Sequence, residues 1–174
     1  MENYKVIMNR IDTFVFDVDG VLTNGLVHVT PEGEILRIMN IRDGFAIKAA
    51  VESGYNVCII SGGKNEGVRK RLENLGVKHI YLGSPDKVAT FKEYIQENNI
   101  NPQNVLYMGD DIPDYNVMQL VGLPTCPVDA VAEIKNISRY VSHKKGGEGA
   151  GRDVIEQTMK VQGKWNLEFD GKHN

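Results

Sequence analysis

The stretch TFVFDVDG, from Thr13 to Gly20, decides the fold of this chain. A short apolar run leads directly into Asp-x-Asp-Gly, and three further runs, at 56–60, 79–82 and 105–108, are also followed by glycine or polar residues. Runs of this length that are apolar on both faces are typical of strands in a parallel sheet covered on both sides. The chain therefore contains four predicted parallel strands.

Segments with helical character separate these strands. Each ends at or near a glycine or an asparagine, which are common helix stops, and they cover residues 43–53, 64–75, 86–98 and 113–121. Strands that alternate with helices of about ten residues form right-handed βαβ units. The predicted fold class is α/β, with a doubly wound, Rossmann-like parallel sheet.

One stretch after the first strand departs from this alternation. Two alternating segments, 26–29 and 34–38, flank the turn sequence Thr30-Pro31-Glu32-Gly33, which predicts a β-hairpin flap. The end of the chain has no clear period. We therefore expect one domain over 1–161 and a C-terminal tail over 162–174.

Composition narrows the functional class. The 174 residues include 41% hydrophobic and 25% charged residues, with a formal net charge of -3, as in an ordinary globular protein. No basic excess favours a nucleic-acid partner, and no apolar run approaches the ~20 residues that cross a bilayer. The two cysteines, Cys58 and Cys126, are isolated, which suits a reducing compartment. We expect a cytoplasmic protein without membrane or nucleic-acid partners.

Polar side chains gather where the predicted strands end. They are Asp17, Asp19, Ser61, Lys87, Asp110, Asp111 and Asp114. Ligands of open α/β sheets bind beyond the carboxyl ends of the strands. Clustered carboxylates remain ionised only beside a cation, and oxygen ligands suit Mg²⁺. Gly20, Gly62 and Gly109 allow backbone N–H groups to approach an anion closely. This edge is therefore a predicted magnesium and phosphate site.

The motifs Asp17-Val18-Asp19-Gly20-Val21-Leu22-Thr23, Ser61, Lys87 and Gly109-Asp110-Asp111-x-x-Asp114 resemble, in order, the four motifs of haloacid dehalogenase-like phosphatases. The resemblance implies that Asp17 is the nucleophile and forms an aspartyl-phosphate. It implies that Asp19 protonates the leaving alcohol and then activates water. Such a division suits phosphoryl transfer, which needs positioning and charge neutralisation.

The same resemblance assigns the remaining site residues. Ser61, Gly62 and Lys87 would hold phosphoryl oxygens, and Lys87 would also offset negative charge. Mg²⁺ would be held by the Asp17 carboxylate, the Asp19 main-chain carbonyl and Asp110. Asp111 and Asp114 would support that shell. Taken without the other motifs, Asp110 and Asp111 could cap the following helix, and Asp114 could be a surface or first-turn acid.

The spacing between motifs leaves no room for a cap domain, so the active site of a monomer would be open to solvent. Further details resemble one capless family, the 3-deoxy-D-manno-octulosonate (KDO) 8-phosphate phosphatases of lipopolysaccharide synthesis. The hairpin, Ile41-Arg42-Asp43-Gly44, and Lys145-Gly146-Gly147-Glu148-Gly149 carry this likeness. It implies a homotetramer in which neighbouring subunits close the site. The tail either frays or docks on a partner through Trp165 and Phe169.

Three basic residues, Arg42, Lys145 and Arg152, are candidates for binding the sugar-acid end of the substrate, with Lys144 beside them, because a carboxylate pairs well with Arg or Lys. A structural ion pair is the alternative for Arg42. Two positions depart from the pattern of the relatives. Asn24 stands where many of them have aspartate. Gly63 stands where enzymes for nine-carbon sialic-type acid 9-phosphates tend to have an acidic residue.

The eight-carbon substrate is therefore the leading hypothesis, and a nine-carbon sialic-type acid 9-phosphate is the alternative. A phosphorylatable receiver domain would also combine acids, a hydroxyl and a lysine, but with the acidic pair on the first strand. A non-catalytic subunit of the same fold is the third alternative.

Overall fold

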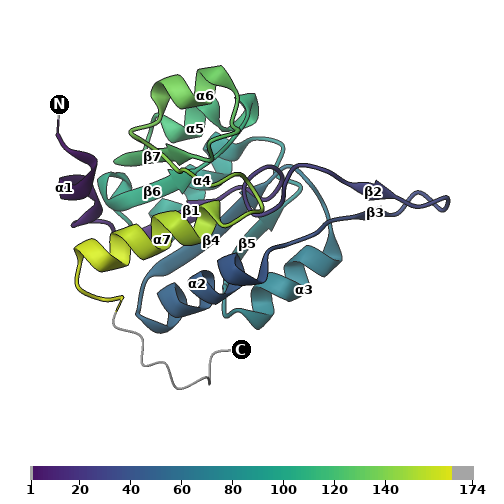
Figure 1. Cartoon of the computed structure of the whole chain (residues 1–174), viewed down its shortest axis with the longest axis horizontal. Coiled ribbons are helices and arrows are strands. Elements are labelled where there is room, and N and C mark those ends of the chain that lie inside the picture. The colour runs from purple at the N-terminus through teal and green to yellow at the C-terminus, as the bar shows by residue number, and fades with distance from the viewer. Residues whose placement is uncertain (1, 166–174) are drawn as a thin grey trace.

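The computed structural model of the chain describes residues 2–165 and has eight strands in this part (Figure 1). The strands are β1 (Thr13–Phe16), β2 (His28–Val29), β3 (Ile35–Leu36), β4 (Asn56–Ser61), β5 (His79–Leu82), β6 (Val105–Met108), β7 (Leu123–Cys126) and β8 (Tyr140–Val141). The helices are α1 (Tyr4–Met8), α2 (Ile41–Glu52), α3 (Glu66–Asn74), α4 (Lys87–Glu97), α5 (Tyr115–Met118), α6 (Ala132–Ile137) and α7 (Ala150–Val161), with short 3-10 turns η1 (Pro102–Asn104) and η2 (Ile112–Asp114).

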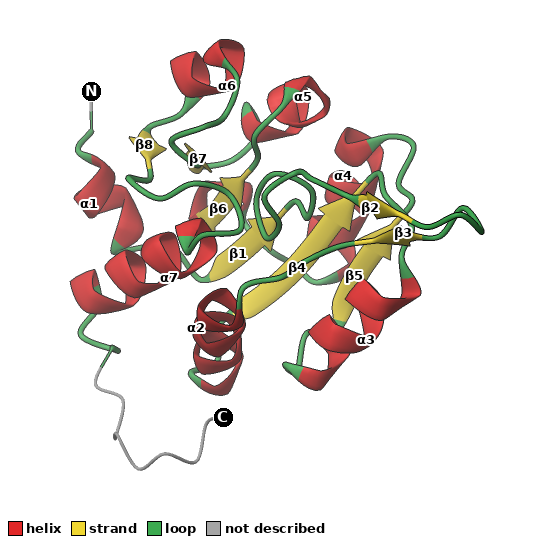
Figure 2. Cartoon of the chain, turned by 45° about the vertical axis from the view of Figure 1, so that its right-hand side comes forward, coloured by secondary structure: helices red, strands yellow, loops and turns green. Residues whose placement is uncertain are grey.

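Six strands form one parallel sheet in the order β5-β4-β1-β6-β7-β8 (Figure 2). The central strand β1 pairs with β4 on one side and β6 on the other, and Phe16 stands level with both Ile59 and Met108. The strand order therefore reverses at β1. Asp17, the next residue, lies at the switch point where doubly wound sheets bind ligands, which confirms the predicted fold class.

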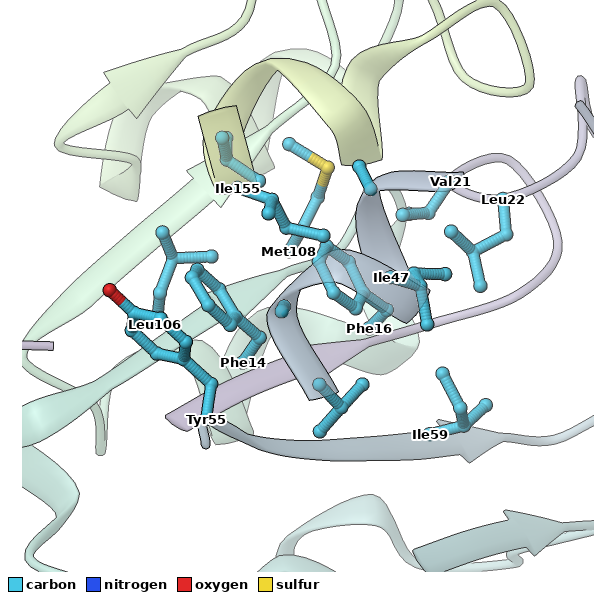
Figure 3. Packing of buried hydrophobic residues seen from close by; sticks show 14 of the residues in the cluster. Phe14, Phe16, Val21, Leu22, Ile47, Tyr55, Ile59, Leu106, Met108 and Ile155 are labelled. Carbon is cyan, nitrogen blue, oxygen red and sulfur yellow. The ribbon is translucent and has the colours of Figure 1, made fainter. Parts of the chain in front are cut away.

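Side chains of β1 alternate between two apolar layers. Phe14 and Phe16 pack with α2 and α7, together with Ile47 and Ile155 (Figure 3). Val15 points to the opposite layer, which α4, α5 and α6 cover. Burying an aromatic or branched side chain contributes about 1.5–3 kcal/mol, so both layers hold β1 firmly. The strand thereby gives the loop that begins at Asp17 a rigid base.

The predicted strands agree closely with the structure, whereas several predicted helix bounds are wrong. The helix predicted to start at residue 43 starts at Ile41, because the Asn40 side chain caps it by accepting from the Arg42 N–H at 2.8 Å. The segment 113–121 holds η2 and the single turn α5 instead of one continuous helix. There the Asp114 side chain is buried and accepts from Lys87 Nζ at 2.7 Å. The sequence patterns did not predict β7, β8, α1, α6 or α7.

The predicted hairpin exists but has only two paired residues in each strand. It projects from the body of the molecule (Figure 1). Its apolar side chains face solvent, with Leu26 72% exposed and Ile38 81% exposed. Such an exposed apolar patch is typical of a surface that binds another protein.

The start of the predicted tail packs against the chain's own core. Gln162 donates to the carbonyls of Met8 and Ile11 at 2.8 and 2.7 Å and accepts from the Tyr55 hydroxyl at 2.6 Å. Trp165 also packs on the core. Residues 166–174, including Phe169, lie outside the described residues.

Both cysteines are free thiols buried in the layer under α4, α5 and α6. Across residues 2–165, none of the helices combines the length and the apolar character that a membrane crossing requires.

Candidate active site

The carboxyl ends of β1, β4 and β6 surround a cavity of about 290 Å³. It is lined by Asp17, Asp19, Gly20, Gly25, Ser61, Gly62, Gly63, Lys87, Asp110, Asp111, Pro113 and Asp114. All the residues predicted to act on the phosphate or the metal therefore meet in one place. A hollow of about 670 Å³ near α1 is larger. It is lined mainly by amide and apolar side chains and does not contain this acidic cluster.

Lys87 connects two of the acids. Its Nζ lies 2.8 Å from Asp17 Oδ2 and 2.7 Å from Asp114 Oδ1, and the side chain is only 7% exposed. Burial alone would lower the pKa of Lys87, but the two carboxylates outweigh it and hold the pKa above its ordinary value. The ammonium is therefore a fixed positive charge beside Asp17. Lys87 is thus a buried part of the site and not a solvated surface lysine.

Asp114 is fully buried, so the alternative of a surface acid is also wrong. Its Oδ1 accepts from Lys87 and, at 2.9 Å, from the Tyr107 hydroxyl, while its Oδ2 accepts from the Asp110 N–H at 3.2 Å. The carboxylate thus orients Lys87 and the loop after β6. Sequence reasoning missed Tyr107, whose only signal was a hydroxyl in an otherwise apolar strand.

Three carboxylates, of Asp17, Asp110 and Asp114, each place one oxygen within 4.8 Å of the others. Burial and the Asp114 charge raise the pKa of Asp17 to about 7, although the positive charge of Lys87 lowers it. Burial, with Asp17 and Asp114, raises the pKa of Asp110 to about 8. These carboxylates need a further cation to ionise together at neutral pH.

Two details fit such a cation. Buried Asp110 Oδ1 has no hydrogen-bond partner among the described residues, although buried carboxylate oxygens are normally satisfied. Gly20 has a φ of +84°, and a Cβ there would overlap the Asp110 carboxylate. The glycine therefore lets Asp110 approach the loop after β1, and an oxygen-rich set of this kind suits Mg²⁺.

Asp19 is held differently from the other acids. Its Oδ1 and Oδ2 accept from Arg37 Nε and Nη2 at 2.6 and 2.9 Å. Arg37 follows the hairpin strand β3, and sequence reasoning did not single it out. A basic residue between the apolar Leu36 and Ile38 of the predicted hairpin segment was the available signal.

Two further predicted residues make local bonds. The exposed Asp111 accepts from the Ile112 N–H at 2.7 Å and caps η2, so it combines the capping role with a place on the cavity wall. Asn24 accepts from the Leu26 N–H at 3.0 Å and forms a turn at the base of the hairpin.

The glycine-rich segment 145–149 supports the loop after β1. A Cβ at Gly146 would overlap the Gly20 carbonyl, and the Gly147 N–H donates to the Val21 carbonyl at 2.9 Å. Only residues without side chains permit this backbone contact. The segment therefore has a structural role in positioning the Asp17–Gly20 loop.

The predicted sugar-acid residues lie elsewhere. Arg42, Lys144 and Arg152 line a second cavity of about 420 Å³, which shares no lining residue with the first, and Lys145 lines neither. Arg152 Nε donates to Glu156 at 3.0 Å, and its guanidinium lies over the Phe45 and Trp165 rings. Among residues 2–165, Arg42 has no carboxylate partner within 4.0 Å, so no ion pair supports its structural alternative.

Comparison with known proteins finds similarity over most of the chain. Residues 79–151 match the haloacid dehalogenase-like hydrolase family. The 3-deoxy-D-manno-octulosonate 8-phosphate phosphatase KdsC of Salmonella typhi is 40% identical over 155 residues, which is 89% of this chain and 82% of the relative. The KdsC of Escherichia coli K12 is 39% identical over the same span.

Solved structures are similar as well. The crystal structure of the Yersinia pestis phosphatase of the same name has a TM-score of 0.90 and 34% identity, covering 92% of this chain and 86% of that one. The Moraxella catarrhalis phosphatase, in complex with a magnesium ion, a phosphate ion and KDO, has a TM-score of 0.90 and 29% identity, covering 93% of each chain.

Proposed function

Because this chain belongs to the KdsC family of haloacid dehalogenase-like phosphatases, we propose that it hydrolyses KDO 8-phosphate to KDO and phosphate, a step of lipopolysaccharide precursor synthesis. It is a phosphoric monoester hydrolase by family. The observation that carries the proposal is the contact of Lys87 with both Asp17 and Asp114 inside the acid-lined cavity. It places a fixed positive charge beside the nucleophile, where a phosphoryl group would gain negative charge.

The reaction proceeds in two displacements at phosphorus. An Asp17 carboxylate oxygen forms a bond to phosphorus while the bond to the sugar oxygen breaks, and Asp19 gives that oxygen a proton. Water then attacks phosphorus, Asp19 takes its proton, and the bond to Asp17 breaks to release phosphate. Ser61 and the Gly62 backbone, at the end of β4, hold the phosphoryl oxygens while Lys87 offsets their charge.

Magnesium is the cofactor that the site residues fit. The Asp17 and Asp110 carboxylates and the Asp19 main-chain carbonyl would hold it, with Asp111 and Asp114 in support. When bound, Mg²⁺ neutralises charge on the transferring group and on the clustered acids. The orphaned Asp110 oxygen and the raised pKa values of Asp17 and Asp110 support this assignment.

A homotetramer is the assembly that we propose, with neighbours covering the open cavity and the 162–174 tail following the catalytic domain of residues 1–161. The exposed apolar side chains of the hairpin, including Leu26 and Ile38, support a contact between subunits. Capless phosphatases need such cover because an active site that excludes water strengthens electrostatic interactions.

Arg42, Lys145 and Arg152 remain proposed contacts of the sugar-acid end. Arg42 has the strongest support, because its side chain is exposed and lacks a carboxylate partner in the described chain. Arg42→Ala should raise KM for KDO 8-phosphate without changing turnover of p-nitrophenyl phosphate, which has no sugar acid. An equal loss for both substrates would contradict a sugar-acid role.

The central test compares phosphate release from eight-carbon and nine-carbon 2-keto-3-deoxy acid phosphates, with Asp17→Asn as the matched variant. A higher kcat/KM for the eight-carbon compound is expected. Asp17→Asn should abolish turnover while the circular dichroism spectrum stays unchanged. A preference for the nine-carbon acid would refute the substrate, and appreciable activity of Asp17→Asn would refute the nucleophile. No release by the wild type would favour a non-catalytic subunit, and a stable phosphorylated protein would favour a receiver.

A further inference from the structure

Arg37 is an unusual side chain for its position in the molecule. It follows β3 on a hairpin whose other side chains mostly face solvent, yet it is only 9% exposed. Its guanidinium meets the Asp19 carboxylate with two parallel hydrogen bonds, of 2.6 and 2.9 Å. A bidentate pair of this kind fixes the orientation of both groups and is stronger than a single bond.

Gly63 makes this pair sterically feasible. A Cβ at Gly63 would lie 2.9 Å from Arg37 Nη2 and 3.0 Å from Asp19 Oδ2. Both distances are shorter than ordinary contacts with a Cβ, so a side chain there would force Arg37 and Asp19 to shift from the positions in which they pair. The absence of a side chain at Gly63 therefore leaves the space in which Arg37 reaches Asp19.

The pair matters because Asp19 is otherwise loosely held. Its side chain is 37% exposed and stands between the buried Val18 and the left-handed Gly20. A carboxylate oxygen has two lone pairs, so each Asp19 oxygen can bind Arg37 with one and use the other to hold the proton that passes to the leaving group. Asp19 also lines the cavity with Asp17. The guanidinium thus selects the orientation that Asp19 presents to a leaving group.

We propose that Arg37 is a positioning residue for Asp19 and that Gly63 leaves the room for their contact. This inference rests on the proposed function, in which Asp19 transfers the leaving-group proton. The hairpin then supplies a residue that orients the active site of its own chain. A purely structural role, in which Arg37 only anchors the hairpin, predicts different kinetics.

The hairpin has a second anchor that serves as a control. Asn65 Nδ2 donates to the Ile35 carbonyl at 2.8 Å, while Asn65 Oδ1 accepts from the Val68 N–H and caps α3. Asn65→Asp keeps the cap and removes the hairpin bond. It therefore loosens the hairpin and removes no atom of the contact between Arg37 and Asp19.

The test compares Arg37→Met, Arg37→Lys and Asn65→Asp on two substrates with different leaving groups, KDO 8-phosphate and p-nitrophenyl phosphate. With KDO 8-phosphate, Arg37→Met should lower kcat roughly 10- to 100-fold, since general acid–base catalysis contributes about 10²–10⁴, and KM should stay within about threefold. Arg37→Lys should recover part of the loss. The burst of p-nitrophenolate from p-nitrophenyl phosphate should change less than threefold, because this leaving group departs without a proton. Asn65→Asp should stay within about twofold of wild type on both substrates.

A double-mutant cycle tests Gly63. Gly63→Ala should lower kcat for KDO 8-phosphate in the wild type and have a smaller effect in Arg37→Met, because the contact with Arg37 Nη2 is then gone and only the contact with Asp19 Oδ2 remains. Equal loss on both leaving groups, an additive cycle, or an Asn65→Asp variant that matches Arg37→Met would each overturn the inference. An unaffected Arg37→Met in an active enzyme would refute this inference alone, whereas an inert wild type would refute the proposed function and this inference with it.

Discussion

Asp110→Asn should stabilise the metal-free protein while it destroys the metal site. The pKa of Asp110 is raised by burial and by Asp17 and Asp114 to about 8, from an ordinary 3.8. An unfolded chain loses this proton near pH 4, whereas the folded chain keeps it until about pH 8. Stability therefore falls as the pH rises through that interval, because the unfolded state binds fewer protons.

The size of the effect follows from this interval. Near pH 7.5 the raised pKa of Asp110 lowers the free energy of unfolding by about 5 kcal/mol, at about 1.4 kcal/mol per pH unit. Solvent reaches part of Asp110 and screens its charge, so we expect about half of that, 2–3 kcal/mol. For a chain of this length the gain raises Tm by about 5–10 °C. Asparagine has nearly the same shape, which preserves the close packing on Gly20.

Thermal unfolding in EDTA at pH 5 and pH 8, with and without Mg²⁺, measures this prediction. Asp110→Asn should melt above wild type at pH 8 in EDTA, should gain much less at pH 5, and should no longer respond to Mg²⁺. Asp111→Asn is the control. Residue 111 is next to Asp110 but exposed, and asparagine keeps the side-chain oxygen that caps η2. A metal-free Asp110→Asn that melts at or below wild type at pH 8 would refute the electrostatic reasoning.

Three further predictions concern other parts of the molecule. Tyr107→Phe removes the hydroxyl that donates to Asp114 at 2.9 Å. We expect kcat to fall about 3- to 10-fold and urea unfolding to show a loss of about 1 kcal/mol of stability. Unchanged kinetics would contradict a role of Tyr107 in orienting Asp114. Gln162→Ala removes three hydrogen bonds; it should lower the free energy of unfolding by about 2–3 kcal/mol, whereas no loss would show that the tail begins frayed. Leu26→Glu places a charge on the exposed hairpin; light scattering should detect smaller assemblies, and an unchanged mass would argue against hairpin-mediated contacts.

The sequence determined the sheet and the membership of the site through local patterns. Apolar runs such as Thr13–Phe16 have the length and composition of buried strands, and helices between them dictate parallel pairing. Parallel strands bring their carboxyl ends to one edge. Asp17, Lys87 and Asp110 therefore had to converge, whatever the details of packing.

Elements with weak local patterns could not be predicted in this way. β7 contains Pro124 and β8 has only two residues, so neither shows a clear period. The predicted helix over 113–121 shortened because the buried contacts of Asp114 with Lys87 and Tyr107 take its side chain into the site. Helical propensity acts over a few residues, and tertiary contacts override it.

Only the tertiary structure decided which side chains touch. Arg37 lies 18 residues from Asp19 along the chain, and Gln162 lies 154 residues from Met8. No local period records such pairs, because they depend on the reach of a side chain and on the space its neighbours leave, as Gly63 leaves for Arg37. The chemical groups of the site are thus readable in the order of residues, while their orientation and charge state arise from burial and distance in the folded chain.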